Sequence, residues 1–232
     1  MLNISLKKFK SLHKNKKNQV IFFSKSTNGE KEIVNLINNF LIERNSFVFE
    51  SVEKGKIKGR YTIFGKNPDK IWEFNNSKCF IYKDDKKIKI KGKPKEIIER
   101  IIENFKFKIP KNLPPISSIL SGYFSYDIIR YIEKIPNSCK DDLKIPDARL
   151  LRPKTLIIHD NLKKKIYFII NCFSDEKIND YKKKFEEISS EIEKLIFLSS
   201  YETDFFIQNN IKKIKIKSNI SKKRFIKNVN RA

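Results

Sequence analysis

Two short apolar runs on either side of a polar, glycine-containing segment impose the strongest constraint on how this chain can fold. The runs are Phe47–Phe49 and Tyr61–Phe64, and Gly55 and Gly59 lie between them. Aromatic and β-branched residues on both sides of a glycine-containing turn are typical of two antiparallel strands. The chain is therefore expected to build at least part of its core on an antiparallel sheet.

Three polar residues lie at the ends of these two predicted strands. Glu50 and Ser51 follow the first strand, and Arg60 precedes the second. A carboxylate accepts hydrogen bonds from an ammonium group and a guanidinium donates to a carboxylate, so this rim has the groups needed to hold a free amino acid. Ordinary polar caps on a hairpin are the other interpretation, and composition alone favours it.

The remaining pattern alternates between strands and helices. The strands are predicted at 20–23, 70–75, 78–82, 86–91, 122–126, 154–160 and 165–172. The helices are predicted at 30–43, 94–107 and 128–133, and from an N-cap at Asp175 to about residue 198. Residues 1–18 are rich in lysine and weakly patterned, which indicates a loosely held leader. The fold class that follows is α+β, with an antiparallel, sandwich-like sheet flanked by helices.

The formal net charge of +24 suggests a nucleic-acid partner. Only eight of the 51 basic residues are arginine, however, and arginine is the residue favoured for forked contacts with phosphates and bases. The lysines are spread along the chain, and the aromatic residues occupy core-facing positions of the pattern rather than a basic stacking surface. We therefore expect no nucleic-acid partner, and keep a basic nucleic-acid-binding module as the alternative from another functional class.

The cysteines and histidines give no sign of a metal site. Cys79, Cys139 and Cys172 lie far apart without a C-x-x-C spacing, and Cys79 and Cys172 fall in apolar runs, where cysteine acts as a small hydrophobic residue. His13 and His159 are isolated, which is typical of structural histidines. No apolar run approaches the roughly 20 residues of a membrane span and no signal peptide is visible, so a cytoplasmic protein without a membrane partner is expected.

Three segments resemble, in the right order, the N-terminal part of anthranilate synthase component I. They are Phe47–Gly65, Gly122–Glu133, and Ile145–Pro153 followed by Asp160-Asn161. In the first segment the family has a Leu-Leu-Glu-Ser motif, and here the apolar residues Val48 and Phe49 stand in place of the two leucines. Aminodeoxychorismate synthase component I shares the second segment and is the alternative within the same group of enzymes.

The resemblance implies a regulatory site around the first motif. In the family this motif lines the site where L-tryptophan, the end product of the pathway, binds and inhibits. We accordingly expect Ser51 to contact the effector, Glu50 to order the strand end or the ammonium side, and Arg60 to shape the pocket wall. The resemblance also implies a glutamine amidotransferase subunit as a partner that supplies ammonia.

The resemblance further implies that the catalytic residues lie elsewhere. The family converts chorismate and ammonia to anthranilate, with Mg²⁺, in a C-terminal chorismate-binding domain. We expect a basic leader at 1–18, the N-terminal domain at 19–217, and the truncated start of the chorismate-binding domain at 218–232, with Ser221 as a helix cap. No catalytic residue, metal site or cofactor is then expected in this chain, which is predicted to pack against that missing domain, and whether it is an enzyme by itself stays open.

Overall fold

The computed structural model describes residues 2–27, 30–41, 43–50, 59–83, 86–136, 141, 143–200 and 217–231. The chain divides into two compact units, residues 1–202 and 203–232. In the second unit, α5 (Lys222–Arg231) is a short basic helix with no buried residue. Its N-terminus is capped as predicted, because the Ser221 hydroxyl oxygen accepts a hydrogen bond of 3.3 Å from the backbone N–H of Arg224.

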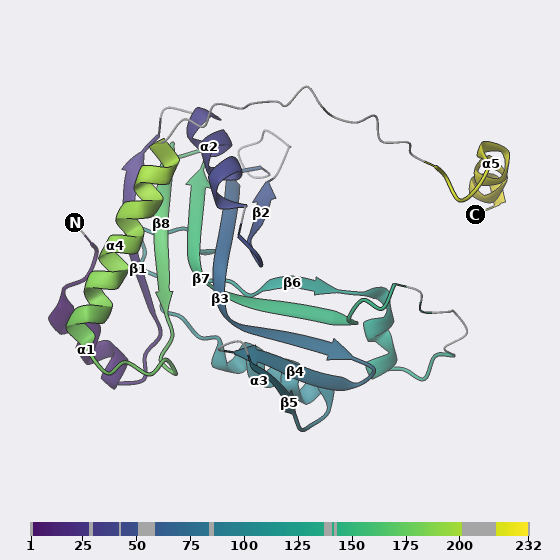
Figure 1. Cartoon of the computed structure of the whole chain (residues 1–232), viewed down its shortest axis with the longest axis horizontal. Helices are drawn as coiled ribbons and strands as arrows, with labels where there is room; N and C mark the ends of the chain where they lie inside the picture. The colour runs from purple at the N-terminus through teal and green to yellow at the C-terminus, as the bar shows by residue number, and fades with distance from the viewer. Residues whose placement is uncertain are drawn as a thin grey trace. The chain divides into compact units, whose positions relative to one another are not determined.

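The first unit is built on one antiparallel sheet, to which eight strands within the described residues contribute (Figure 1). The strands are β1 (Gln19–Ser26), β2 (Phe47–Glu50), β3 (Tyr61–Asn75), β4 (Lys78–Lys83), β5 (Lys86–Ile90), β6 (Ser121–Phe124), β7 (Ala148–Asp160) and β8 (Lys165–Cys172). Their order is β1-β8-β7-β3-β4-β5, and β2 pairs with β3 while β6 pairs with β7. The hairpin predicted at 154–172 and the strand pair predicted around Gly59 are both confirmed.

Helices cover this sheet on its outer faces. They are α1 (Leu6–Lys14), α2 (Glu30–Phe40), α3 (Pro94–Asn104), the 3₁₀ helix η1 (Tyr126–Tyr131) and α4 (Tyr181–Ser200). The cluster beneath α1, α2 and α4 contains Phe9, Leu36 and Ile192 from the helices and Phe168 from β8, all at most 2% exposed. Strand β8 is buried on both faces, which explains why its sequence is a nearly continuous apolar run. The α+β class with helices outside an antiparallel sheet is confirmed.

Strands β3 and β7 are long enough to belong to two parts of the sheet. Figure 1 shows that both change direction along their length: β2 and β8 pair with one part, and β4 and β6 with the other, while β1 and β5 extend the sheet beyond β8 and β4. The register shifts between Pro68 and Lys70, opposite Pro153, as at a β-bulge. The two strands predicted at 61–64 and 70–75 are thus one strand interrupted by an irregularity, and the sandwich-like shape comes from bending a single sheet.

The prediction of a loosely held leader at residues 1–18 is wrong. Ser5 caps α1, and Phe9 on this helix is fully buried against α4. The Phe9 ring lies 5.7 Å from the Phe185 ring and 6.1 Å from the Tyr181 ring, measured between centroids. The Asn3 side chain also hydrogen-bonds the backbone of β1. The segment is part of the core because one apolar residue per turn suffices to dock a short helix whose other faces carry lysine.

The prediction that Asp175 caps the long helix is also wrong. Helix α4 begins at Tyr181, and the Asp180 carboxylate accepts hydrogen bonds from the backbone N–H groups of Lys182 and Lys183, at 2.9 and 3.1 Å. Asp175 instead forms ion pairs with Lys70 and Arg152. Two buried or partly buried cations attract this carboxylate more strongly than an exposed helix end does.

Candidate functional site

Strand pairing brings the ends of β2, β3 and β7 to one rim of the sheet. Glu50 at the end of β2 lies opposite Thr62, and Tyr61 at the start of β3 lies opposite Asp160 at the end of β7. Glu50 and Arg60 are therefore on the same rim, as the sequence analysis predicted. Ser51 lies outside the described residues.

A forked ion pair joins Arg60 and Asp160 across this rim. Arg60 donates from Nε to Oδ1 of Asp160 at 3.0 Å and from Nη2 to Oδ2 at 2.8 Å. The Asp160 side chain is only 1% exposed, and its Oδ1 also accepts the backbone N–H groups of Leu162 and Lys163, both at 3.1 Å. One carboxylate thus closes the β7–β8 turn and fixes the start of β3.

The turn residue Asn161 strengthens the same junction. Its backbone N–H donates to the carbonyl oxygen of Arg60 at 2.8 Å, and its side-chain amide donates to the carbonyl oxygen of Gly59 at 3.2 Å. The Arg60 guanidinium lies 4.8 Å from the centre of the Tyr61 ring. Two chain segments about 100 residues apart are therefore held together by side-chain and backbone contacts at a single point.

The surroundings of the Arg60–Asp160 pair favour the charged forms of both side chains. Burial by itself would raise the pKa of the Asp160 carboxyl, but the hydrogen bonds from Arg60 and from two backbone N–H groups outweigh it and lower the pKa below its usual value. The hydrogen bond to Asp160 raises the pKa of Arg60. Burial raises the pKa of Tyr61, whose phenol stays neutral at neutral pH.

Glu50 and Arg60, the two described residues of the predicted site, differ in how many of their hydrogen-bonding groups are already used within the protein. Glu50 is exposed and makes no ion pair with another described residue. Arg60 uses the N–H of Nε and one N–H of Nη2 for Asp160, and its other N–H groups have no partner among the described residues. Asp160 was recognised in the sequence as a turn residue and missed as the partner of Arg60. No local signal identifies this pair, because it depends on the register of β3 against β7.

A buried histidine lies next to the rim. His159 is 2% exposed, and neither ring nitrogen has a hydrogen-bond partner among the described residues. Burial lowers the pKa of its imidazole, with Lys164 lowering it further, so the ring is neutral at neutral pH. It lies opposite Thr62 and Ile166 in the sheet, which makes it part of the core rather than a group exposed to a ligand.

The second motif lies far from this rim. Gly122 pairs with Leu150, ten residues before Asp160 along β7, which corresponds to about 30 Å of extended strand. A Cβ on Gly122 would lie 1.9 Å from the carbonyl oxygen of Arg149, so only glycine permits this approach of β6 to β7. Asp127 and Arg130 form the predicted ion pair, at 3.0 Å.

The described residues do not fit a metal centre of the kind that Mg²⁺ requires. Among them no three histidine, cysteine or acidic side chains are grouped so that they could hold a metal ion. Three acidic side chains around Arg152 and Lys154 are neutralised by cations, since Asp69 and Asp175 pair with Arg152, and Glu176 pairs with Lys154. In the described part of the chain, no helix is both long and apolar enough to span a membrane.

Comparison with known proteins gives concordant matches. Residues 45–232 match the family described as chorismate binding enzyme. Anthranilate synthase component 1 of Acetivibrio thermocellus is 33% identical over 205 residues, which are 86% of this chain and 41% of that protein. The enzyme subunit of the same name from Cereibacter sphaeroides is 34% identical over 127 residues, covering 53% of this chain and 25% of that protein.

A solved structure shares the fold. Anthranilate synthase component I from Streptococcus pneumoniae TIGR4 matches with a TM-score of 0.51 and 17% identity, over 72% of this chain and 34% of that one. The chain thus spans less than half the length of these relatives. The family match begins at residue 45, so the predicted start of the chorismate-binding domain at residue 218 is not confirmed.

Proposed function

Because the chain belongs to the family of chorismate binding enzymes, we propose that it forms the regulatory and scaffolding portion of an anthranilate synthase component I. The product of such an enzyme, anthranilate, feeds tryptophan biosynthesis. The observation that carries this proposal is the rim where Glu50, exposed and without an ion-pair partner among the described residues, and the guanidinium of Arg60, fixed by Asp160, flank Ser51 in the sequence. This rim lies within the segment that matches the family.

In this proposal the rim supplies part of a feedback site for L-tryptophan. Ser51 hydrogen-bonds the effector, and Glu50 accepts from its ammonium group. Arg60 contributes the pocket wall rather than a free carboxylate receptor, since Asp160 holds two of its three nitrogen atoms. A hydrogen bond of this kind inside a mostly apolar pocket is worth roughly 1–3 kcal/mol, or about 5- to 150-fold in affinity.

The proposal leaves the chemistry itself outside the described residues. Binding of Mg²⁺ requires grouped acidic side chains, and in the described part of the chain no three histidine, cysteine or acidic side chains are grouped so that they could hold a metal ion. We place the conversion of chorismate, the magnesium ion and the catalytic base in a chorismate-binding part that the sheet supports. A glutamine amidotransferase subunit is the proposed source of ammonia.

The test uses a chimera in which this chain replaces the matching segment of the Acetivibrio thermocellus relative. Ser51→Phe removes the proposed hydrogen bond and adds a bulky ring. Since an effector acts only through its different affinities for two states, this change should abolish feedback and leave the rate without tryptophan nearly unchanged. The measurement is the rate of anthranilate formation against L-tryptophan concentration.

Two further variants make the test specific. Glu50→Gln should shift the inhibition curve to higher tryptophan concentration, because the amide attracts an ammonium group less than a carboxylate does. Ser125→Ala changes a hydroxyl just after β6, whose last residue Phe124 pairs with Ala148, about 40 Å of extended strand before Asp160 along β7, and should leave the curve unchanged. If Ser51→Phe leaves the inhibition curve where it was, the effector does not bind at this rim.

Two alternatives are weaker. An aminodeoxychorismate synthase component I would share the segment at Gly122–Glu133, but the relatives described above carry the name anthranilate synthase. A nucleic-acid-binding module would need aromatic side chains exposed among basic ones. Phe9, Phe64 and Phe168 of the first unit are instead fully buried in its core.

A further inference from the structure

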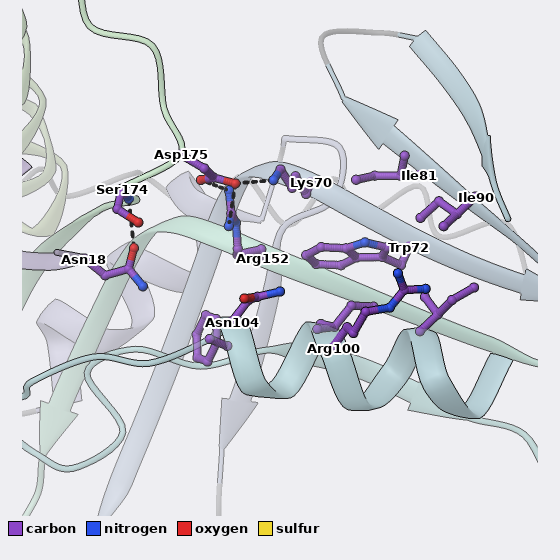
Figure 2. Close-up of a pocket in the computed structure, with 13 residues that line it drawn as sticks. Asn18, Lys70, Trp72, Ile81, Ile90, Arg100, Asn104, Arg152, Ser174 and Asp175 are labelled. Atoms are coloured by element: carbon purple, nitrogen blue, oxygen red, sulfur yellow. Dashed lines mark hydrogen bonds and ion pairs between the residues drawn. The ribbon is translucent and has the colours of Figure 1, made fainter. Parts of the chain in front are cut away.

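A second concave region lies on the other part of the sheet, away from the rim. A cavity of about 460 Å³, here called the α3 cleft, opens between α3 and the strands β3, β4 and β5 (Figure 2). Its inner wall is formed by Trp72, Ile97 and Ile101, which are 7%, 3% and 9% exposed. Lys70, Arg100 and Asp175 lie around it and make it polar on one side. Its volume falls within the range of about 300–1,000 Å³ that is typical of small-molecule sites.

Most of the charge around the α3 cleft is already neutralised. Lys70 and Arg152 both pair with Asp175, and Arg152 also forms a forked pair with Asp69. Two cations and two carboxylates therefore balance one another. Burial and these hydrogen bonds act in opposite directions on Asp175, and the bonds prevail and lower the pKa of its carboxyl to about 2. Asp175 therefore stays ionised at neutral pH, the four charges cancel, and this cluster offers no unpaired cation to a second anionic group of a ligand.

Among the described residues that line the cleft, Arg100 is the cation without a carboxylate partner. Its Nε donates only to the backbone carbonyl oxygen of Glu96, at 3.4 Å, and it forms no ion pair with another described residue. Its Nη2 lies beside Gly92, where a Cβ would come within 3.1 Å of it. Figure 2 shows the guanidinium and the indole of Trp72 directed at the same space between α3 and the sheet.

Arg100 and Trp72 together favour one class of ligand. A guanidinium with free N–H groups binds a carboxylate through two parallel hydrogen bonds. An indole set among isoleucine side chains offers a flat apolar surface on which a ring packs. We propose that the α3 cleft binds a small organic monocarboxylate with a planar apolar group, its carboxylate on Arg100 and its ring on Trp72. This site is separate from the rim and does not depend on the function proposed for it.

The chain offers a direct probe of this site. Trp72 is the only tryptophan in the sequence, so intrinsic tryptophan fluorescence reports on the α3 cleft alone. Titration of the full chain with benzoate, at ionic strength held constant with sodium chloride, should give a saturable change in emission. For a probe of this size a dissociation constant of about 1–10 mM is expected. Benzamide, which lacks the charge, and cyclohexanecarboxylate, which lacks the planar ring, should both bind more weakly.

Matched variants on α3 test the role of Arg100. Arg100→Gln should weaken benzoate binding about tenfold or more, and Arg100→Lys should weaken it less, because the charge stays while the fork is lost. Lys95→Gln removes a charge from the same helix at an exposed position that does not line the cleft, and should leave binding unchanged. Both residues are exposed, so all three variants are expected to fold, which circular dichroism verifies.

Three results would overturn the proposal. The first is the absence of a saturable emission change with benzoate. The second is an affinity for benzamide equal to that for benzoate, which would show that the charge is not recognised, or an equal affinity for cyclohexanecarboxylate, which would show that the planar ring is not. The third is unchanged binding in Arg100→Gln, which would show that this guanidinium does not hold the carboxylate.

Discussion

The N-terminal helix provides a stringent test of the fold, because Phe9→Ala distinguishes an integral helix from a loosely attached leader. Phe9 is fully buried beneath α4. It is surrounded by the rings of His13, Tyr181 and Phe185, at centroid distances of 6.5, 6.1 and 5.7 Å. Its carbonyl oxygen accepts a hydrogen bond from the buried Gln19 side chain, which ties α1 to β1.

The burial of Phe9 sets the size of the expected loss in the free energy of unfolding. Replacing a fully buried phenylalanine with alanine lowers the free energy of unfolding by about 3–5 kcal/mol, through lost transfer free energy and the cavity left behind. The lower half of that range is expected here, about 3–4 kcal/mol, because a short terminal helix relaxes into the cavity more easily than a central element does. With a urea m value of about 3 kcal/mol/M, the midpoint should fall by about 1 M.

Urea unfolding followed by Trp72 fluorescence measures this effect, since Trp72 lies on the other part of the sheet and reports on the whole unit. Lys7→Ala is the control on the same helix; Lys7 is exposed, and its removal should change the free energy of unfolding by at most about 0.5 kcal/mol. If Phe9→Ala behaves like Lys7→Ala, α1 does not belong to the core and the reasoning fails.

Two further predictions concern carboxylates. Asp160→Asn should destabilise the chain in a pH-dependent way. The pKa of Asp160 in the folded state lies below its value in the unfolded state, which is about 3.9. The stability that the carboxylate confers is therefore present above the unfolded-state pKa and is lost as pH falls through the folded-state pKa. Urea midpoints of wild type and variant should differ by a constant amount between about pH 5 and 7 and converge below about pH 4; a constant difference down to pH 2 would contradict this. Asp180→Ala should cost about 1 kcal/mol and speed amide hydrogen exchange at Lys182 and Lys183, whereas Asp175→Ala should leave exchange at the start of α4 unchanged. Equal effects of the two variants on that exchange would show that the cap is assigned wrongly.

Several elements were predictable because their signals are local. The apolar stripe of α3 and its first-turn proline identify that helix, and the two apolar runs around Gly59 identify β2 and β3. The burial of Cys79 and Cys172 follows from their apolar surroundings in the sequence, and burial raises the pKa of both thiols to about 12. The position of Glu50 and Arg60 at strand ends was likewise visible in the sequence.

Other features were missed although a weak local signal existed. Helix α1 has a serine cap and apolar residues at Leu6 and Phe9, three positions apart, but lysines between them lower the average hydrophobicity of the segment. The two aspartates before α4 are equally plausible caps from composition. Only the position of Lys70, which lies 105 residues before Asp175 in the sequence, decides which of them is free to cap the helix.

By itself, the sequence determined the antiparallel character of the sheet, the identity of most helices and the family resemblance, because periodic burial and turn residues act over a few positions. Which charged side chains form ion pairs depends on the tertiary structure. Arg60 and Asp160 are 100 residues apart, and their forked pair exists only because β3 and β7 align in one register of many that their apolar patterns permit. The α3 cleft depends in the same way on how a helix packs against strands that are distant in the sequence. Such contacts arise from long-range packing, for which a local pattern contains no information.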